Sequence, residues 1–331
     1  MNERSLLRPF WSTLIFTLGL LAPRAASAYC RATTCDPRVG DVCNRDAGGC
    51  VTGYPPLYWP GSCVTFAVQR DGSALNRITG AAMEVAVHRA FETWMSADCG
   101  NGRHPGIHVE TLGLIECDQV EFNAQRANAN DFMFRDRDWS VDSAAGDALG
   151  LTTAHFDSRS GQIQDADVEI NGSDGNLTNA DVDDGADLLS ILTHESGHFL
   201  GLDHSRDVNS VMYPNYRPGM SDLRHLSADD SAGICAIYPP SLPQTSAECR
   251  PWNGFSGVCA NEQREPLGCS FAPNATLRAG ATKRARFCLG LLVALALVLA
   301  KRRPRARSTG PDSKVEFSRG GARRCALLAR S

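Results

Sequence analysis

The segment from Leu188 to Ser205, LLSILTHESGHFLGLDHS, constrains the fold most, because it places three histidines and a glutamate directly after an apolar run. Side chains four positions apart share one face of a helix, so the rings of His194 and His198 can reach a common point. The same helix cannot carry His204 to that point. Gly201 can adopt the positive φ that ends a helix and turns the chain. The spacing therefore predicts a helix, a turn and three imidazoles that face one metal ion.

The helix in this segment is predicted to be buried and to begin near Gly185. Asp183 and Asp184 stand just before it, where a carboxylate can cap free N–H groups and interact favourably with the helix dipole. Its apolar residues are Leu188, Leu189, Ile191, Leu192 and Phe199.

Three histidine ligands leave a fourth position for water, which distinguishes a catalytic zinc site from a structural one. Zinc lowers the pKa of a bound water to about 7, and Glu195 can take its proton as the water attacks a carbonyl. The same carboxyl can then pass the proton to the departing amine. A short HExxH pattern occurs by chance on solvated helices, but a buried helix with three unpartnered histidines would carry a large desolvation cost. The longer pattern therefore favours a hydrolytic zinc centre.

These residues resemble the metzincin metalloproteases, and within them the matrixins. The resemblance rests on HExxHxxGxxH, on Met212 eight residues past His204, and on LSADDSAGICAIY at 226–238. The specific match covers 186–238, and a fold match extends back to about Gly61. The resemblance implies an α+β metzincin fold, with a twisted, mostly parallel sheet, an active-site helix and a smaller C-terminal subdomain. It also implies that Met212 forms a turn beneath the zinc, and that residues 213–216 wall the pocket for the side chain following the cleaved bond.

The activity that the resemblance implies is that of a zinc-dependent metalloendopeptidase. A protein or peptide substrate would be bound along an edge strand, for which we take GQIQDADVEI, 161–170. Two alternatives remain: a non-catalytic zinc-containing adhesion or peptide-binding module, and a hydrolase of cell-wall peptides. Glu195 argues against the first, because a binding module needs no base beside its metal.

The first 28 residues are typical of a secretory signal peptide, with Arg4 and Arg8, an apolar core and small residues up to Ala28. All thirteen cysteines follow this point. In an exported chain they predict disulfides rather than metal clusters, and their odd number leaves at least one unpaired. Residues 29–60 are predicted to be a Cys-rich N-terminal segment. A cysteine between positions 30 and 50 that blocks the zinc is the less favoured alternative.

Residues 61–240 are predicted to form the catalytic domain. Strands are expected near 64–68, 106–114 and 131–136, and a hairpin over 148–171 with its turn at 158–161. A helix should cover 79–95, with one face formed by Met83, Val87, Ala90, Phe91 and Trp94, and another should follow Ser227, with Asp230 as its capping partner.

The chain beyond the catalytic domain is divided into three parts. Residues 241–286 are a linker or a small disulfide-tied module, 287–306 an apolar and basic anchor or sorting segment, and 307–331 a basic tail. The apolar run 287–300 is shorter than the ~20 residues that span a bilayer core, but the cluster of Lys301, Arg302 and Arg303 fits a basic end kept in the cytoplasm. A buried helix is the alternative. We expect a secreted monomer that is either released or anchored to the cell surface or outer envelope.

The remaining charged residues support fewer assignments. The net charge of −4 gives no support to nucleic-acid binding. Calcium could be held by carboxylates, either those of Asp165, Asp167 and Glu169 or those of Asp174, Asp181 and Asp183. His155 lies where the resemblance would put a ligand of a second zinc, but aspartates replace the other histidine expected there. His88, His104, His108 and His225 have no spacing that predicts a site.

Overall fold

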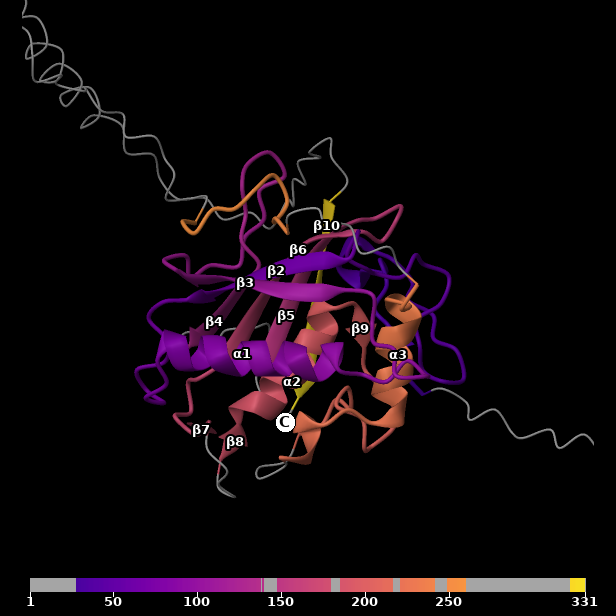
Figure 1. Cartoon of the computed structure of the whole chain (residues 1–331). Helices are drawn as coiled ribbons and strands as arrows, with labels where there is room; N and C mark the ends of the chain where they lie inside the picture. The colour runs from indigo at the N-terminus through magenta and orange to yellow at the C-terminus, as the bar shows by residue number, and fades with distance from the viewer. Residues whose placement is uncertain are drawn as a thin grey trace, which may run out of the picture.

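The computed structural model describes residues 28–137, 139, 148–179, 185–216, 221–241 and 249–259, together with the backbone of 322–330. Figure 1 shows the elements. The strands are β1 (Cys30–Arg31), β2 (Cys63–Gln69), β3 (His108–Ile115), β4 (Asp131–Arg135), β5 (Ala148–Asp157), β6 (Ile163–Asn171), β7 (Leu177–Thr178), β8 (Ala186–Asp187), β9 (Leu202–Asp203) and β10 (Ala322–Arg330). The helices are η1 (Pro37–Val39), α1 (Gly80–Met95), α2 (Leu188–Phe199), η2 (Asp222–Arg224) and α3 (Ala228–Ile237).

The main sheet has six strands in the order β10-β5-β6-β4-β2-β3. The pairs β2–β3, β2–β4 and β4–β6 are parallel, whereas β5 is antiparallel to β6 and β10 is antiparallel to β5. The predicted mostly parallel sheet is confirmed for the part of the sheet that lies within the catalytic domain. The predicted hairpin is also present, as β5 and β6.

The prediction that residues 161–170 form an edge strand is wrong. Residues 163–170 belong to β6, which lies between β5 and β4. Alternating apolar and polar residues occur in both strands of the hairpin, so the pattern does not tell which strand lies outermost. In the catalytic domain β5 is the outer strand on this side, and β10 pairs with its outer edge.

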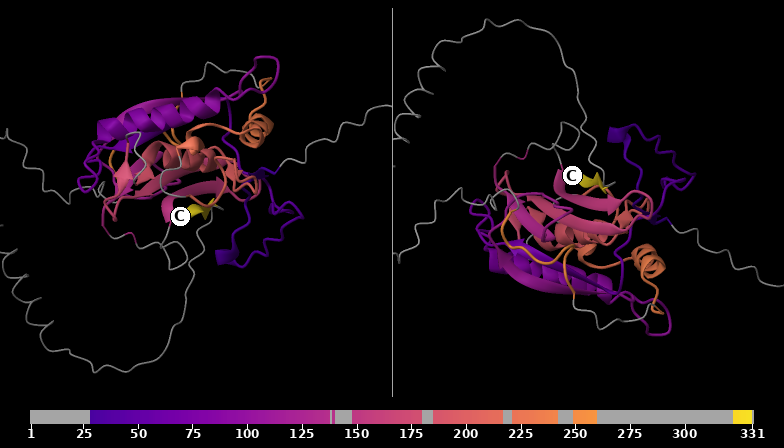
Figure 2. Two further views of the ribbon diagram at one scale, coloured as in Figure 1. Left: turned by 90° about the horizontal axis from the view of Figure 1, so that it is seen from below. Right: turned by 90° about the horizontal axis from the view of Figure 1, so that it is seen from above.

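Helices α1 and α2 pack against each other and against one face of the sheet (Figures 1 and 2). The predicted apolar face of α1 is buried, and Thr79 caps the helix by accepting a hydrogen bond from the N–H of Ala82. The indole N–H of Trp94 donates to the carbonyl of Thr193, 2.8 Å away, which joins the two helices. Between helices and sheet lies a cluster of aromatic rings: Phe66, Phe91, Phe132 and Phe199.

Helix α2 begins at Leu188, three residues later than predicted. Asp187 is its N-cap and accepts a hydrogen bond from the N–H of Ser190 at 2.9 Å. Gly185 has a φ of +112°, and the next two residues are extended because β8 pairs with β7, so the helix starts only after them. The expected caps Asp183 and Asp184 lie outside the described residues. All twelve residues of α2 are buried, as predicted.

Within the described part of the chain, five disulfides join ten of the thirteen cysteines. Cys30–Cys50 and Cys35–Cys43 close loops within the N-terminal segment, and Cys99–Cys235 ties the end of α1 to α3. Cys63–Cys249 and Cys117–Cys259 attach residues 249–259 to the catalytic domain. Cys249 and Cys259 are therefore not bonded to each other. The side chains of Cys269, Cys288 and Cys325 lie outside the described part.

Within the described residues, no helix is both long and apolar enough to cross a membrane. The apolar run 287–300, predicted as an anchor, is not among those residues.

Candidate metal centre

Three imidazoles converge at the end of α2, as the spacing predicted. His194 and His198 lie one turn apart on the helix, and their ring nitrogens and that of His204 all lie within 4.8 Å of one another. Gly201 makes the turn between them, with a φ of +96°. A Cβ at Gly201 would stand 2.8 Å from the carbonyl oxygen of Leu57, so the turn requires glycine both for its φ and for space.

Backbone carbonyls fix how the rings on the helix are turned. His194 Nδ1 lies 2.6 Å from the carbonyl oxygen of Val211, and His198 Nδ1 lies 2.9 Å from that of Leu202. A carbonyl can only accept, so each Nδ1 carries the proton and each Nε2 keeps its lone pair. His198 Nε2 lies 3.3 Å from His204 Nε2. His194 Nε2 is buried and has no hydrogen-bond partner in the described part of the chain.

Burial keeps the imidazoles of His194 and His198 neutral. It lowers the pKa of His194 to about 3, with a further contribution from His204, and lowers the pKa of His198 well below its usual value. A neutral imidazole is the form that binds a metal, and its second nitrogen is normally held by a carbonyl or carboxylate, as here. The donor set, its convergence and the orphaned Nε2 therefore fit a zinc ion.

Glu195 is fully buried beside the imidazoles. Its Oε2 accepts a 2.6 Å hydrogen bond from the hydroxyl of Thr152 on β5, whereas Oε1 has no hydrogen-bond partner among the described residues. Burial raises the pKa of Glu195 to about 8, and the bond from Thr152 opposes this shift. Gly150, also on β5, lets the carboxyl approach, because a Cβ there would stand 2.6 Å from Oε1.

Sequence reasoning identified neither Gly150 nor Thr152. A glycine within a strand often marks a close approach of another group, and that signal could have drawn attention to Gly150. Nothing in the local pattern points to Thr152, because its role depends on how β5 packs against α2.

The turn that carries Met212 lies beneath α2, where Met212 Sδ packs against Gly197. The buried carboxylate of Asp230 holds this turn, accepting hydrogen bonds from the hydroxyl of Ser210 and from the N–H groups of Val211 and Met212. Asp230 also completes the predicted capping box with Ser227 at the start of α3. It therefore joins α3 to the turn, a role that the sequence did not reveal.

A small cavity of ≈ 10 Å³ opens next to His194, and most of its lining is apolar. Tyr213, Pro214 and Tyr216 line it, in agreement with the wall expected at 213–216. Leu149, Ile191 and Leu223 complete the apolar lining. The backbone N–H of Asp187 donates to the hydroxyl of Tyr216 at 2.8 Å, which fixes the position of that ring.

Three of the predicted calcium ligands have protein partners. Asp165 lies 3.4 Å from His155 Nδ1, Asp167 accepts from the N–H groups of Glu121 and Asp131, and Glu169 pairs with Arg135. Asp181 and Asp183 lie outside the described residues, and calcium binding stays a prediction. Cys30, Cys35, Cys43 and Cys50 form disulfides, so none of them offers a thiolate to the zinc.

Comparison with known proteins agrees with this arrangement. Human matrilysin is 40% identical over 183 residues, which cover 54% of this chain and 58% of matrilysin. Rabbit macrophage metalloelastase is 42% identical over 25% of this chain and 19% of its own length, and the Arabidopsis thaliana metalloendoproteinase 1-MMP is 47% identical over 17% and 15%. The chain thus spans less than two thirds of each of these relatives. The family model for matrixin matches residues 58–239, more than half of the chain, and the chain belongs to the matrixin family.

Proposed function

We propose that the protein is a zinc-dependent endopeptidase. His194, His198 and His204 would hold the zinc, Glu195 would serve as general base and then as general acid, and Met212 would support the site from below. The observation that carries this proposal is the convergence of three imidazoles beside a buried carboxyl group. A bound zinc would supply Lewis-acid activation of a water and of the substrate carbonyl.

The environment of Glu195 suits proton transfer near neutral pH. Burial favours its protonated form, whereas a cation at the imidazoles and the hydroxyl of Thr152 both favour the carboxylate. These opposing influences allow Glu195 to take a proton from the attacking water and to return it to the leaving amine. Thr152 holds one carboxylate oxygen, which leaves the other to face the reacting atoms.

The substrate would be an extended peptide paired with the outer edge of β5, the strand that contacts Glu195 through Gly150 and Thr152. In this structure β10 occupies that edge, with Leu327 opposite Thr152, so a substrate bound there would displace residues 322–330. The lining of the cavity beside His194 favours an apolar side chain after the cleaved bond.

The domain limits and location belong to the same proposal. Residues 1–28 would direct export and be removed, 29–60 would form the Cys-rich segment and 61–240 the catalytic domain. The secreted monomer would keep residues 241–286 as a linker or small module that two disulfides tie to the catalytic domain, 287–306 as an anchor or sorting segment and 307–331 as a basic tail. Calcium at the acidic loops would stabilise the domain.

The decisive experiment compares the full chain with its Glu195→Gln variant. We expect the parent to bind one zinc per chain and to cleave casein until a chelator is added. The variant should bind zinc equally but lose cleavage, whereas Glu92→Gln, on the exposed side of α1, should leave both unchanged. A fully active Glu195→Gln variant would reject the mechanism.

The two alternatives predict other results. A parent that binds zinc but cleaves neither casein, gelatin nor peptidoglycan fragments would indicate a binding module. A parent that cleaves only the peptidoglycan peptides would indicate a cell-wall hydrolase.

A further inference from the structure

Residues 29–57 of the N-terminal segment lie outside the part that matches the matrixin model, yet they contact the loop that carries His204. Before His204, β1 pairs antiparallel with β9, with Cys30 opposite Asp203. The N–H of Ala32 donates to the carbonyl of Gly201 at 3.0 Å. The backbone that leads from the helix end to His204 is therefore fixed by residues 30–32.

A second part of the segment contacts the loop just after His204. Arg206 Nη1 donates to the carbonyl of Ala47 at 2.9 Å. The side chain of Arg206 also packs directly on Gly49, where a Cβ would stand 2.5 Å from Arg206 Nε. The same segment therefore contacts this loop both before and after His204.

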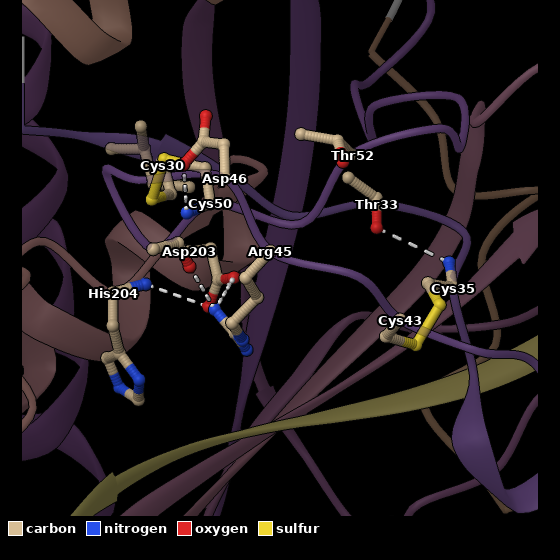
Figure 3. A network of polar contacts seen from close by, with 12 residues as sticks. Cys30, Thr33, Cys35, Cys43, Arg45, Asp46, Cys50, Thr52, Asp203 and His204 are labelled. Carbon is tan, nitrogen blue, oxygen red and sulfur yellow. Dashed lines mark hydrogen bonds and ion pairs between the residues drawn. A yellow bond between two sulfur atoms is a disulfide. The ribbon is translucent and has the colours of Figure 1, made fainter.

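Asp203 adds a polar link at the centre of this contact. Its Oδ1 accepts a 2.8 Å hydrogen bond from the N–H of His204, and its Oδ2 lies 3.8 Å from Arg45 Nη1 (Figure 3). Arg45 in turn donates to the carbonyl of Gly49 at 2.6 Å.

The Cys30–Cys50 disulfide joins the two contacts covalently. Cys30 lies in β1, and Cys50 directly follows Gly49. In Figure 3 this disulfide lies above Asp203 and His204, whereas Cys35–Cys43 lies at the opposite side of the view. In Figure 2 the segment, in indigo, forms a lobe at the side of the domain.

The three histidines are held differently. His194 and His198 belong to a helix whose residues are all buried, so the core of the domain fixes them. His204 is half-buried and lies on a loop. Its position therefore depends more on local contacts. The N-terminal segment supplies contacts on both sides of it, and Ser205 also donates to the carbonyl of Met212 at 2.8 Å and to the carboxylate of Asp229 at 2.7 Å.

We propose that the N-terminal segment, closed by the Cys30–Cys50 disulfide, holds His204 in the position needed for metal binding. We call this role the brace, and we expect loss of the disulfide to weaken metal binding. The inference rests on the proposed zinc site. Residues that orient a metal ligand without touching the metal typically contribute 10- to 100-fold to affinity, and we expect an effect at the lower end, about 10-fold.

The test compares two double variants of the full chain that each remove one disulfide from the same segment. Zinc-loaded Cys30→Ser/Cys50→Ser, Cys35→Ser/Cys43→Ser and the parent are mixed with a chromogenic chelator, and the rate of zinc release is recorded. We expect release about 10-fold faster from Cys30→Ser/Cys50→Ser and within about twofold of the parent from Cys35→Ser/Cys43→Ser. Circular dichroism shows whether each variant is folded.

A second pair of variants keeps every disulfide. Arg206→Ala removes the contact after His204 and should also accelerate zinc release. Arg38 pairs with Asp36 instead, so Arg38→Ala should not accelerate it. This pair decides the question if the variant without Cys30–Cys50 does not fold. The brace would be overturned if Arg206→Ala and any folded Cys30→Ser/Cys50→Ser variant released zinc at the parental rate. It would also be overturned if the control variants Cys35→Ser/Cys43→Ser and Arg38→Ala released zinc as fast as these two. A parent that holds no zinc would instead overturn the proposed function, and the brace with it.

Discussion

The hydroxyl of Thr152 donates a 2.6 Å hydrogen bond to Glu195 Oε2, and both residues are completely buried. This bond crosses from the outer strand of the catalytic domain to the helix that carries two of the histidines. It therefore links the strand proposed to bind substrate with the group proposed to move the proton. The carboxyl cannot rotate without breaking it.

Replacing Thr152 by Val should lower kcat/KM about 10- to 100-fold, because a hydrogen bond to a charged group contributes roughly 1.5–3 kcal/mol. Val keeps the shape of the side chain but removes the donor. Thr152→Ser keeps the donor and should retain most of the activity. Steady-state kinetics on a peptide, with zinc content measured in parallel, would check this. Equal activity of the Val and Ser variants would show that the hydroxyl has no such role.

Leu223 should control which residue is accepted after the cleaved bond. It lines the cavity beside His194, and Leu223→Ala would deepen it. We expect kcat/KM for a peptide with a large apolar residue at that position to rise about 10-fold relative to one with a small residue, since one methylene in such a pocket is worth roughly 1–3 kcal/mol. Val85→Ala, at an exposed position on α1, serves as control. If the ratio of the kcat/KM values for the two peptides did not change, the substrate side chain after the cleaved bond would bind elsewhere.

The local sequence pattern was sufficient to predict that the three imidazoles converge and that the chain turns at Gly201. Helical spacing fixes the faces of His194 and His198, and few residues other than glycine can make the turn that follows. The pattern was not sufficient where two distant segments meet. Thr152 reaches Glu195 only because β5 packs over α2, and Asp230 reaches the Met212 turn only through the position of α3.

The edge strand and the disulfides show the same limit. Residues 161–170 have the alternation of a strand with one buried face, but the order of strands in a sheet depends on long-range pairing. The spacing of the cysteines predicted bonds, whereas partners such as Cys63 and Cys249 are brought together only by the folded domain.

The contribution of His194 to the stability of the zinc-free protein should fall as the pH drops below 6.5. The unfolded chain takes up a proton on His194 near pH 6.5, whereas burial keeps the folded-state pKa at about 3. Between these values the unfolded state binds the additional proton, so His194 alone reduces the free energy of unfolding by about 1.4 kcal/mol for each pH unit lost.

This contribution can be isolated with His194→Asn, which can still donate to the carbonyl of Val211. Urea unfolding of the zinc-free parent and variant is measured at pH 6 and pH 5. Between these two values the free energy of unfolding should decrease less in the variant than in the parent. Glu195, whose pKa is raised to about 8 by burial, has the opposite effect above pH 4.5, but it affects both proteins and cancels in the comparison. His104→Asn, at an exposed position, should behave as the parent. If the free energy of unfolding changed equally with pH in the parent and in His194→Asn, the lowered pKa of His194 would be contradicted.

Gly197 should resist a substitution that helix propensity alone would favour. On an exposed helix, Ala in place of Gly stabilises by about 1 kcal/mol. At Gly197 the new Cβ would collide with Met212 Sδ and stand 2.7 Å from Cζ2 of Trp94, so we expect a loss of about 1–3 kcal/mol. Urea unfolding would measure it, and a cycle with Met212→Ala should show non-additive effects, because the smaller side chain makes room for the methyl group. Additive losses, or a more stable Gly197→Ala variant, would mean that the Met212 turn does not pack on α2 as the structure has it.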